Sequence, residues 1–457
     1  MLRLNLNKMK IVIAGAGDVG FHLAKLLSNE SQDTYVIDSN AKKLKYIDEH
    51  LDVITLKGDA TSIKILKDVG IEQADLLLAV TESQNTNLTI AALSKKLGVK
   101  KTIARISNTE FLTTDEINFA EVGIDYMISP EYLAAQEIEV LLKESVFNDK
   151  IEFENGLINI LGARLSSKSP LVNKTVKQAK EEFFDIDFTT ISLKRENTVE
   201  TIIPRGDTVF KHHDQVYFSV TAESVDKIYP LIGKEKIGIK DVMILGGSKI
   251  GQKAAKSLCS HNFNVKIIEQ KREKAFELAD NLCDALIVEG DGRNVELLEE
   301  ESLGNMDAFV AVTGNSETNI MSCLVAKSKG VKKTIALVEN MDYINISQTI
   351  GIDTLINKKL LAASAIFKHV RKGKVLAVAN LHNVDAEVLE FFVRRNTKAT
   401  QVPIKDINLT KKAVIGGVVR KGVAMMTFGN FQIEKGDRVI VFCLPEAIGD
   451  VEKLFNN

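Results

Sequence analysis

Short runs of apolar residues alternate with longer stretches of helical apolar spacing along the first third of the chain. The apolar runs predict strands near residues 11–14, 34–37, 53–56, 76–80 and 102–105. The stretches between them predict helices near residues 18–29, 40–50, 61–70, 85–97 and 109–122. Strands that alternate with helices in this way form a parallel sheet with helices on both faces. A sixth strand at 126–128 and a helix over 130–147 complete this predicted doubly wound unit.

The chain contains a long internal repeat. The heptapeptide GVKKTIA occupies residues 98–104 and returns unchanged at residues 330–336, 232 positions later. Glycine-aspartate pairs at 58–59 and 290–291 keep the same offset. A period of this length is far longer than that of solenoid repeats, and it indicates the duplication of a whole module.

A different pattern follows each predicted doubly wound unit. Residues 151–230 and 374–455 carry short alternating runs broken by turn signals, which predict small α+β domains of hairpins with one or two helices. The predicted fold is therefore α/β, a tandem duplication of a Rossmann-like parallel-sheet domain followed by a small α+β domain. The predicted domains are 1–148, 149–233, 238–372 and 373–457, with linkers near 148–153, 233–238 and 371–374.

A glycine-rich turn lies between the first predicted strand and the first predicted helix. Its residues are Gly15, Ala16, Gly17, Asp18, Val19 and Gly20. A G-x-G-x-x-G turn between a strand and a helix is the context of the dinucleotide-binding fingerprint. There the first glycine permits a tight turn, the second lets the backbone approach a pyrophosphate, and the third lets the helix pack closely. The alternative is that these glycines only join a strand to a helix.

An acidic residue stands where such a fingerprint needs one. Asp38 follows the apolar end of the second predicted strand, about 20 residues after the glycines, where a carboxylate hydrogen-bonds the ribose hydroxyls. A carboxylate at this place repels a 2′-phosphate, so it favours NAD(H) over NADP(H). The sequence therefore predicts a bound adenine dinucleotide or a related nucleotide.

Polar residues follow three further strands of the first unit. Asp59 comes after the third strand, Thr81 and Glu82 after the fourth, and Arg105 ends the fifth. The carboxyl ends of parallel strands are where ligands lie in an open sheet, so Asp59 and Thr81 are candidate nucleotide contacts, and Arg105 a candidate phosphate contact. The alternatives are helix N-caps for Asp59 and Thr81 and a surface salt bridge for Arg105.

The second copy of the glycine turn is altered. It reads Gly246, Gly247, Ser248, Lys249, Ile250 and Gly251. Ser248 replaces the glycine that approaches the pyrophosphate, and Leu337 replaces Arg105, whereas Glu269 keeps a ribose carboxylate and Lys249 adds a possible phosphate contact. Two interpretations stay open for this copy: a second nucleotide site, or a structural copy kept for packing.

Composition excludes several classes of function. The formal net charge of −2 gives no long-range attraction to nucleic acid or to anionic lipid. No apolar run approaches the ~18 residues of a membrane span, and residues 1–10 lack the apolar core of a secretory signal, so a cytoplasmic location is expected. The four cysteines have no metal-ligand spacing, and the seven histidines form no acid-base arrangement, which predicts neither a metal site nor catalytic residues.

The order of these motifs resembles the family of domains that regulate potassium conductance. The resemblance rests on the glycine turn, Asp38, Asp59, Thr81 with Glu82, and Arg105, and it covers essentially the whole chain. In the small domain it extends to Leu193-Lys194-Arg195, Ile203 to Thr208, and Asp214. The duplication is similar to that of the peripheral regulatory subunits of Trk-type potassium uptake systems.

This resemblance implies a non-catalytic regulatory subunit. It implies a homo-oligomeric, tetrameric ring on the inner face of the cell membrane, which gates an integral-membrane potassium transport subunit according to nucleotide state. NAD(H), with ATP and ADP as further ligands, is the implied cofactor of Gly15–Gly20, Asp38, Thr81, Glu82 and Arg105, and by repeat of Gly246–Gly251 and Glu269. An NAD-dependent oxidoreductase of unknown substrate and a scaffold with empty sites are the two alternatives.

Overall fold

The computed structural model describes most of the chain. It covers residues 9–29, 32–114, 116–196, 198, 200–236, 238–340, 351–370, 375–380, 386–394, 397–407 and 409–456. The expectation about a secretory signal concerns residues that are mostly outside these ranges. No helix among the described residues combines the length and the apolar character that crossing a bilayer requires.

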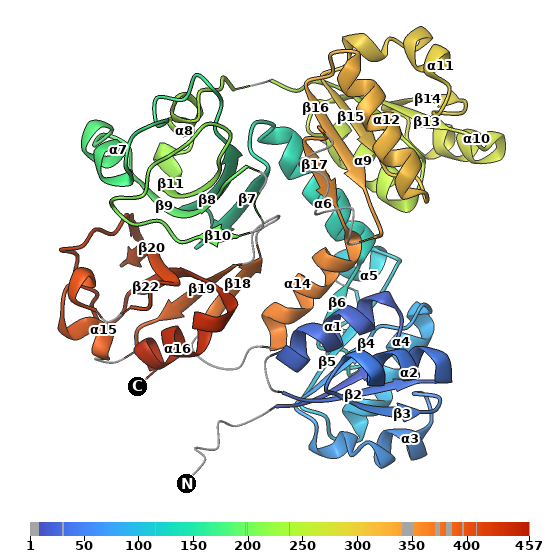
Figure 1. The fold of residues 1–457 in the computed structure, drawn as a ribbon. Coiled ribbons are helices and arrows are strands. Elements are labelled where there is room, and N and C mark those ends of the chain that lie inside the picture. The colour runs from blue at the N-terminus through green and yellow to red at the C-terminus, as the bar shows by residue number, and fades with distance from the viewer. Residues whose placement is uncertain are drawn as a thin grey trace. The chain divides into compact units, whose positions relative to one another are not determined.

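The first parallel sheet has the strand order β3-β2-β1-β4-β5-β6 (Figure 1). Its strands are β1 Lys10–Ala14, β2 Asp33–Asp38, β3 Ile54–Lys57, β4 Leu76–Ala79, β5 Lys101–Arg105 and β6 Tyr126–Ile128. β4 is buried along its whole length, as its unbroken apolar sequence requires. The order reverses between β1 and β4, and ligands of open α/β sheets bind beyond the strand ends at such a switch point.

The second parallel sheet repeats the first. Its strand order is β14-β13-β12-β15-β16-β17, which is the same topology in the second half of the sequence. Its strands are β12 Asp241–Leu245, β13 Asn264–Glu269, β14 Ala285–Glu289, β15 Ala308–Ala311, β16 Lys333–Leu337 and β17 Thr354–Ile356. The predicted duplication of a Rossmann-like domain is confirmed.

Helices alternate with these strands along the chain. In the first half they are α1 Asp18–Asn29, α2 Ala41–His50, α3 Ile63–Asp68, α4 Gln84–Lys96, α5 Glu110–Thr113 and α6 Pro130–Lys143. In the second half they are α9 Lys249–Ser260, α10 Arg272–Asn281, α11 Val295–Glu300, α12 Ser316–Ser328 and α14 Lys358–Val370. α3 and α4 bury Leu66, Ile90 and Ala91 against β1 and β4, and α11 and α12 make the same kind of core with β12 and β15.

Two antiparallel sheets form the predicted small domains. The first has the order β10-β9-β11-β8-β7, with strands β7 Asp149–Phe153, β8 Ile158–Arg164, β9 Phe188–Lys194, β10 Thr201–Ile202 and β11 Gln215–Thr221. The second has the order β18-β19-β22-β20-β21, with strands β18 Val375–Asn380, β19 Glu387–Phe392, β20 Ala413–Arg420, β21 Val423–Met425 and β22 Arg438–Cys443. Their helices are α7 Val176–Glu182, α8 Ile228–Leu231, α15 Lys398–Gln401 and α16 Ile448–Asn456.

Each small domain holds a buried aspartate-arginine pair. Asp214 precedes β11, is 1% exposed, and accepts hydrogen bonds from Arg195 and from the Lys211 N–H. Asp437 precedes β22 and accepts hydrogen bonds from the Arg420 Nε and Nη2 atoms, both at 2.8 Å. The Arg195 and Asp214 of the sequence motif are thus structural partners that fix the start of the last strand.

The two small sheets pack against each other. They share a core to which β8 gives Ile158 and Ile160 and β22 gives Ile440 and Phe442. The Arg205 guanidinium, in the loop after β10, donates to the backbone oxygens of Thr410 (3.1 Å) and Ala413 (3.3 Å) at the start of β20. The two domains therefore form one continuous body.

A pair of carboxylates lies at this interface. Glu390 of β19 is 4% exposed, and the guanidinium of Arg438 lies 3.6 Å from it and also pairs with Glu154. Burial raises the pKa of Glu390 to about 8, and the adjacent Glu154 adds to the shift although Arg438 opposes it. The folded protein therefore holds this proton more tightly than the unfolded chain, where a glutamate has a pKa of about 4.3.

We expect the free energy of unfolding to fall as the pH rises from about 5 to about 8, because only the folded state keeps the Glu390 proton across this window. Glu390 contributes its full stabilisation at a pH below its pKa in the unfolded chain. This stabilisation is lost as the pH rises to its pKa in the folded protein. Urea unfolding at several pH values gives the free energy of unfolding as a function of pH. The slope of this dependence should be smaller in Glu390→Gln than in wild type, by at most about 1.4 kcal/mol per pH unit. Glu152→Gln, at a neighbouring position that is 55% exposed, is the control. Identical slopes in Glu390→Gln and wild type would contradict the assignment.

Two predictions about secondary structure are wrong. The helix expected over 109–122 stops at Thr113, because Thr114 is extended and the side chains of Thr114 and Asn118 accept hydrogen bonds from backbone N–H groups two residues on. The linker expected at 148–153 is largely strand β7, which pairs with β8. The linker expected at 371–374 lies outside the described residues.

The chain divides into two compact units. One contains Met1–Ala135 and Asn357–Val370, and the other contains Gln136–Ile356 and Arg371–Asn457. Helix α14 comes from the second half of the sequence but belongs to the first unit, where it packs against α1 (Figure 1). The boundaries of the four predicted domains stay a prediction.

Candidate functional site

The first glycine turn is tightly closed at both ends. Gly15 has a φ of 113° and donates to the Ile37 oxygen at 2.8 Å, and a Cβ there would lie 2.9 Å from the Thr81 nitrogen. A Cβ on Gly20 would lie 1.9 Å from the Gly15 oxygen. Only glycine fits at these two positions, so the turn brings the end of β1, the start of α1 and the end of β4 together.

The middle of the turn is open. A Cβ on Gly17 would meet no protein atom within 4 Å, in contrast to Gly15 and Gly20. Gly17 directly precedes α1, whose first residue Asp18 is exposed, whereas Ala16 and Val19 are buried. The backbone at Gly17 therefore faces open space next to the N-terminus of a helix, where a phosphate is favoured.

The Asp38 carboxylate joins this turn to the second strand. One oxygen accepts from the Ala16 N–H at 2.6 Å, and the other accepts from the Asn40 N–H at 2.7 Å. Asp38 thus lies beside the glycine turn, as predicted. Asp38 is half-buried, and its two hydrogen bonds fix the glycine turn relative to β2. Its interaction with a ribose stays a prediction.

Asp59 and Glu82 are exposed at the same edge of the sheet. Asp59 accepts from the Thr61 N–H and hydroxyl, both at 2.8 Å, and these hydrogen bonds lower the pKa of its carboxyl. Glu82 is 89% exposed and forms an ion pair with Lys43 at 3.4 Å. The Asp59 bonds make a turn before α3, whose N-cap is Ser62, so Asp59 is not the helix N-cap considered from the sequence.

Thr81 and Arg105 are both engaged with other side chains. The Thr81 hydroxyl and N–H lie 2.6 and 2.8 Å from the same oxygen of Asn87. The Arg105 guanidinium lies 3.7 Å from the carboxylate of Glu131, and Arg105 is 25% exposed. The salt bridge considered for Arg105 is thus present, and contacts of either residue with a nucleotide stay predictions.

Asn87 is a residue of this edge that the sequence did not single out as part of the site. Its amide nitrogen donates to the backbone oxygens of Thr81 (3.1 Å) and Arg105 (2.9 Å), so it ties the end of β4 to the end of β5. Asn319 makes the same bonds to Thr313 and Leu337 in the second half. The recurrence of Thr81 and Asn87 as Thr313 and Asn319 in the repeat was the available signal.

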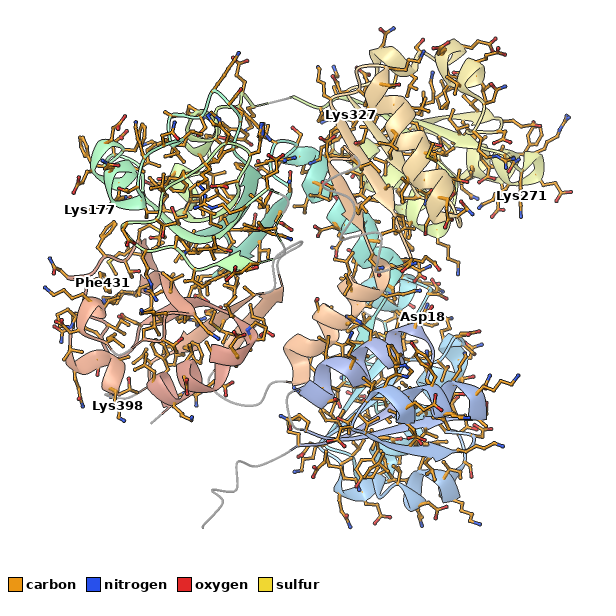
Figure 2. The ribbon with its side chains drawn as sticks, viewed as in Figure 1. Asp18, Lys177, Lys271, Lys327, Lys398 and Phe431 are labelled. Atoms are coloured by element: carbon orange, nitrogen blue, oxygen red, sulfur yellow. The ribbon has the colours of Figure 1, made fainter. Side chains whose placement is uncertain are left out.

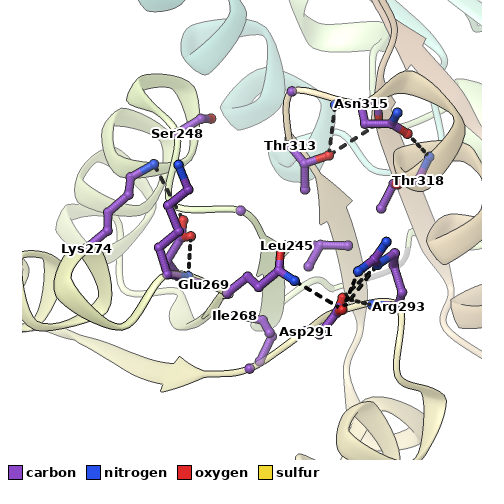
Figure 3. A pocket seen from close by; sticks show the side chains of 16 residues that line it. Leu245, Ser248, Ile268, Glu269, Lys274, Asp291, Arg293, Thr313, Asn315 and Thr318 are labelled. Carbon is purple, nitrogen blue, oxygen red and sulfur yellow. Dashed lines mark hydrogen bonds and ion pairs between the residues drawn. The ribbon is translucent and has the colours of Figure 1, made fainter.

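The second sheet has a cavity at the equivalent edge. It measures about 460 Å³ and lies between the second glycine turn, the loop after β14 and the start of α12 (Figure 3). Its lining includes Glu269, Lys274, Asp291, Arg293 and Thr313. Asp291 and Arg293 pair at 2.7 Å, and their mixed charges give the cavity both cationic and anionic walls.

Glu269 takes the place of Asp38 in this copy. Its oxygens accept from the Gly247 and Lys271 N–H groups, both at 2.9 Å, which repeats the bonds of Asp38. Burial raises the pKa of Glu269, but these hydrogen bonds and Lys274 lower it below the usual value. A Cβ on Gly247 would lie 3.0 Å from this carboxylate and 2.3 Å from Leu278. In this copy Glu269 replaces Asp38 and Gly247 replaces Ala16. The longer glutamate side chain needs the space that a Cβ at residue 247 would take, so the two replacements compensate for each other.

Ser248 caps the helix that the second turn precedes. Its hydroxyl oxygen accepts from the Gly251 N–H at 3.3 Å and donates to the Val312 oxygen at 2.8 Å. Lys249 is exposed at the first position of α9, and Ile250 is 2% exposed in the core. A side chain thus uses one of the N–H groups that a phosphate would otherwise bind at this turn.

No metal centre accompanies these turns. Within the ranges that the structure describes, no group of three or more histidine, cysteine, aspartate or glutamate residues could hold a metal ion. The four cysteines are all free thiols, and burial raises the pKa of the Cys323 thiol.

Comparison with known proteins assigns the family. The family model of the TrkA-N domain matches residues 11–130 and 242–358, and that of the TrkA-C domain matches residues 160–233 and 388–456. A relative from Halomonas elongata, Trk system potassium uptake protein TrkA, is 32% identical over 98% of both chains. The chain belongs to the TrkA family. TrkA homolog 1 of Methanosarcina mazei is also 32% identical, over 98% of this chain and 100% of its own.

Solved structures share the fold of this TrkA-family chain. The GsuK channel has a TM-score of 0.63 at 14% identity, over 99% of this chain and 80% of its own. The GsuK RCK domain has a TM-score of 0.60 at 14% identity, over 99% and 96%. These likenesses and the two TrkA domain types confirm the predicted tandem fold. Membership of the TrkA family also confirms the prediction of a regulatory chain over that of an oxidoreductase.

Proposed function

We propose that this chain is the cytoplasmic regulatory subunit of a Trk-type potassium uptake system, and that NAD(H) or an adenine nucleotide at its first glycine turn gates the transport subunit in the membrane. Family membership supports the potassium uptake system, because the relatives are named for it. The GsuK channel, which has the same fold at a TM-score of 0.62, is described as bound to NAD.

The observation that carries the proposal is the open position at Gly17, between two glycines that are closed by backbone. A diphosphate there would meet the N–H groups at the start of α1, and Asp38 lies where the ribose hydroxyls would follow. Gly15–Gly20, Asp38, Thr81, Glu82 and Arg105 would surround this ligand, with Asp59 at the adjacent strand end.

The ligand would act by binding, since a regulatory nucleotide undergoes no covalent change. It shifts a conformational equilibrium only by the difference between its affinities for the two conformations. We propose that the chain does this within a homo-oligomer, a tetrameric ring attached to the inner face of the membrane. Each chain contains two copies of the module, and within such a ring one copy could turn as a rigid body against the other.

The second turn is proposed as a weaker site for the same class of ligand. The cavity beside Glu269 supports this role, because it offers space next to the ribose carboxylate. Ser248 opposes tight binding of a diphosphate, because its hydroxyl already caps α9. Gly246, Gly247, Lys249, Ile250 and Gly251 complete this proposed site.

Substitution of Asp38 tests the assignment of the ligand. Asp38→Ala should weaken NADH binding about tenfold or more, which is the scale of a lost hydrogen bond to a charged group. Isothermal titration of the full chain with NADH, NAD, ATP and ADP measures this, and thermal unfolding shows whether the variant is folded. Glu269→Ala, the equivalent change in the second copy, is the matched control and should retain the tighter binding event. Unchanged NADH affinity in Asp38→Ala would reject the assignment.

A further inference from the structure

A cation stands beside the first glycine turn. Asp18 is the first residue of α1 (Figure 2). Lys359, the second residue of α14, places its Nζ 2.7 Å from the Asp18 carboxylate. The Lys359 side chain is 18% exposed, whereas that of Asp18 is 70% exposed. The ammonium group is thus held at the turn by a largely covered stem, and the carboxylate that it pairs with is open to solvent.

The first half of the sequence has the opposite charge at the equivalent place. Glu131 lies three residues beyond the end of β6, as Lys359 lies three residues beyond the end of β17, and Glu131 pairs with Arg105. In the second half Leu337 replaces Arg105, so the acid and its arginine partner have both been lost. The lysine that replaces the acid has its partner at the first glycine turn.

We propose that Lys359 binds the phosphate groups of the nucleotide at the first glycine turn, and that it exchanges its ion pair with Asp18 for them. This inference rests on the proposed function. An ammonium group on a flexible four-carbon stem is a point charge suited to phosphate oxygens. Asp18 precedes the turn's buried Val19 and directly follows Gly17, so a group within 2.7 Å of its carboxylate lies near the open backbone position.

The ligand class follows from this position. The nucleotide would carry at least two phosphates. One would bind the N–H groups at the helix N-terminus beside Gly17, and a second would bind the Lys359 ammonium group. The site is then built from both halves of the sequence, since α14 follows β17 directly along the chain. Occupancy of the first turn is thereby linked to the helix that the second half contributes.

Nucleotides that differ only in phosphate number show whether Lys359 binds phosphate or only stabilises the packing of α14. Isothermal titration of the full chain with AMP, ADP and ATP should show that Lys359→Ala loses about twofold affinity for AMP and about tenfold for ADP and ATP. Lys359→Arg should recover most of the loss, and the difference should shrink as salt is added. Lys358→Ala, the adjacent lysine on α14, is the matched control and should bind all three like wild type.

Asp18→Asn is the second variant, and it leaves α14 unaltered. Removal of the competing carboxylate should raise the affinity for ADP about two- to fivefold. An equal loss for AMP, ADP and ATP in Lys359→Ala, or unchanged affinity in both Lys359→Ala and Asp18→Asn, would overturn the inference alone. A wild-type chain that binds none of the nucleotides would overturn the proposed function itself.

Discussion

Gly17→Ala is expected to lower the affinity for NADH by at least about tenfold while the chain stays as stable as wild type to within about 1 kcal/mol. The added Cβ would contact no protein atom within 4 Å, and Gly17 does not have a left-handed φ, so alanine is tolerated by the fold. The same Cβ would occupy the space through which a diphosphate approaches the backbone. Titration with NADH and thermal unfolding measure the two effects separately.

Gly449→Ala is the control for this change. Gly449 lies in α16, and a Cβ added there would also meet no atom within 4 Å. Because Gly449 belongs to a small domain, its alanine variant should bind NADH normally. Equal NADH affinity in Gly17→Ala and wild type would show that the open position is not used by the ligand.

Asp437→Ala is expected to destabilise the chain by about 3 kcal/mol, the largest loss of stability that we predict. Asp437 is fully buried, and its removal takes away the acceptor of the Arg420 Nε and of the Glu434 N–H, and one of the two acceptors of the Arg420 Nη2. The expected loss is at the lower end for a broken buried pair, because Arg420 keeps its bonds to Glu434 and to the Gln432 oxygen. Urea unfolding followed by circular dichroism measures the change.

Glu434→Ala provides the comparison within the same cluster. Glu434 pairs with the same arginine at 2.6 Å but is 62% exposed, so its loss should cost less than about 1 kcal/mol. Similar losses in the two variants would show that burial of Asp437 does not determine its contribution.

The features that the sequence predicted correctly depend on neighbours along the chain. The strands of both parallel sheets follow from continuous apolar runs, and the glycine turn follows from three glycines between a strand and a helix. The repeat of GVKKTIA made the duplication visible without any structure. The helix expected over 109–122 failed because polar side chains at Thr114 and Asn118 bind backbone N–H groups there instead.

The features that the sequence missed depend on contacts between distant residues. Lys359 reaches Asp18 only because α14 belongs to the first compact unit, which no local pattern indicates. Gly247 and Glu269 replace Ala16 and Asp38 in the second copy. This paired replacement is explained only by the structure, in which the carboxylate accepts a hydrogen bond from the N–H of the residue in the turn. Side-chain caps such as Ser248 likewise need the coordinates of the helix terminus.

The most direct test of the central proposal is a crystal structure of the full chain grown with saturating NADH. We predict the diphosphate over the backbone of Gly15–Gly20, with the ribose hydroxyls on Asp38. NADH bound elsewhere, or a first glycine turn that holds no NADH at saturation, would contradict it.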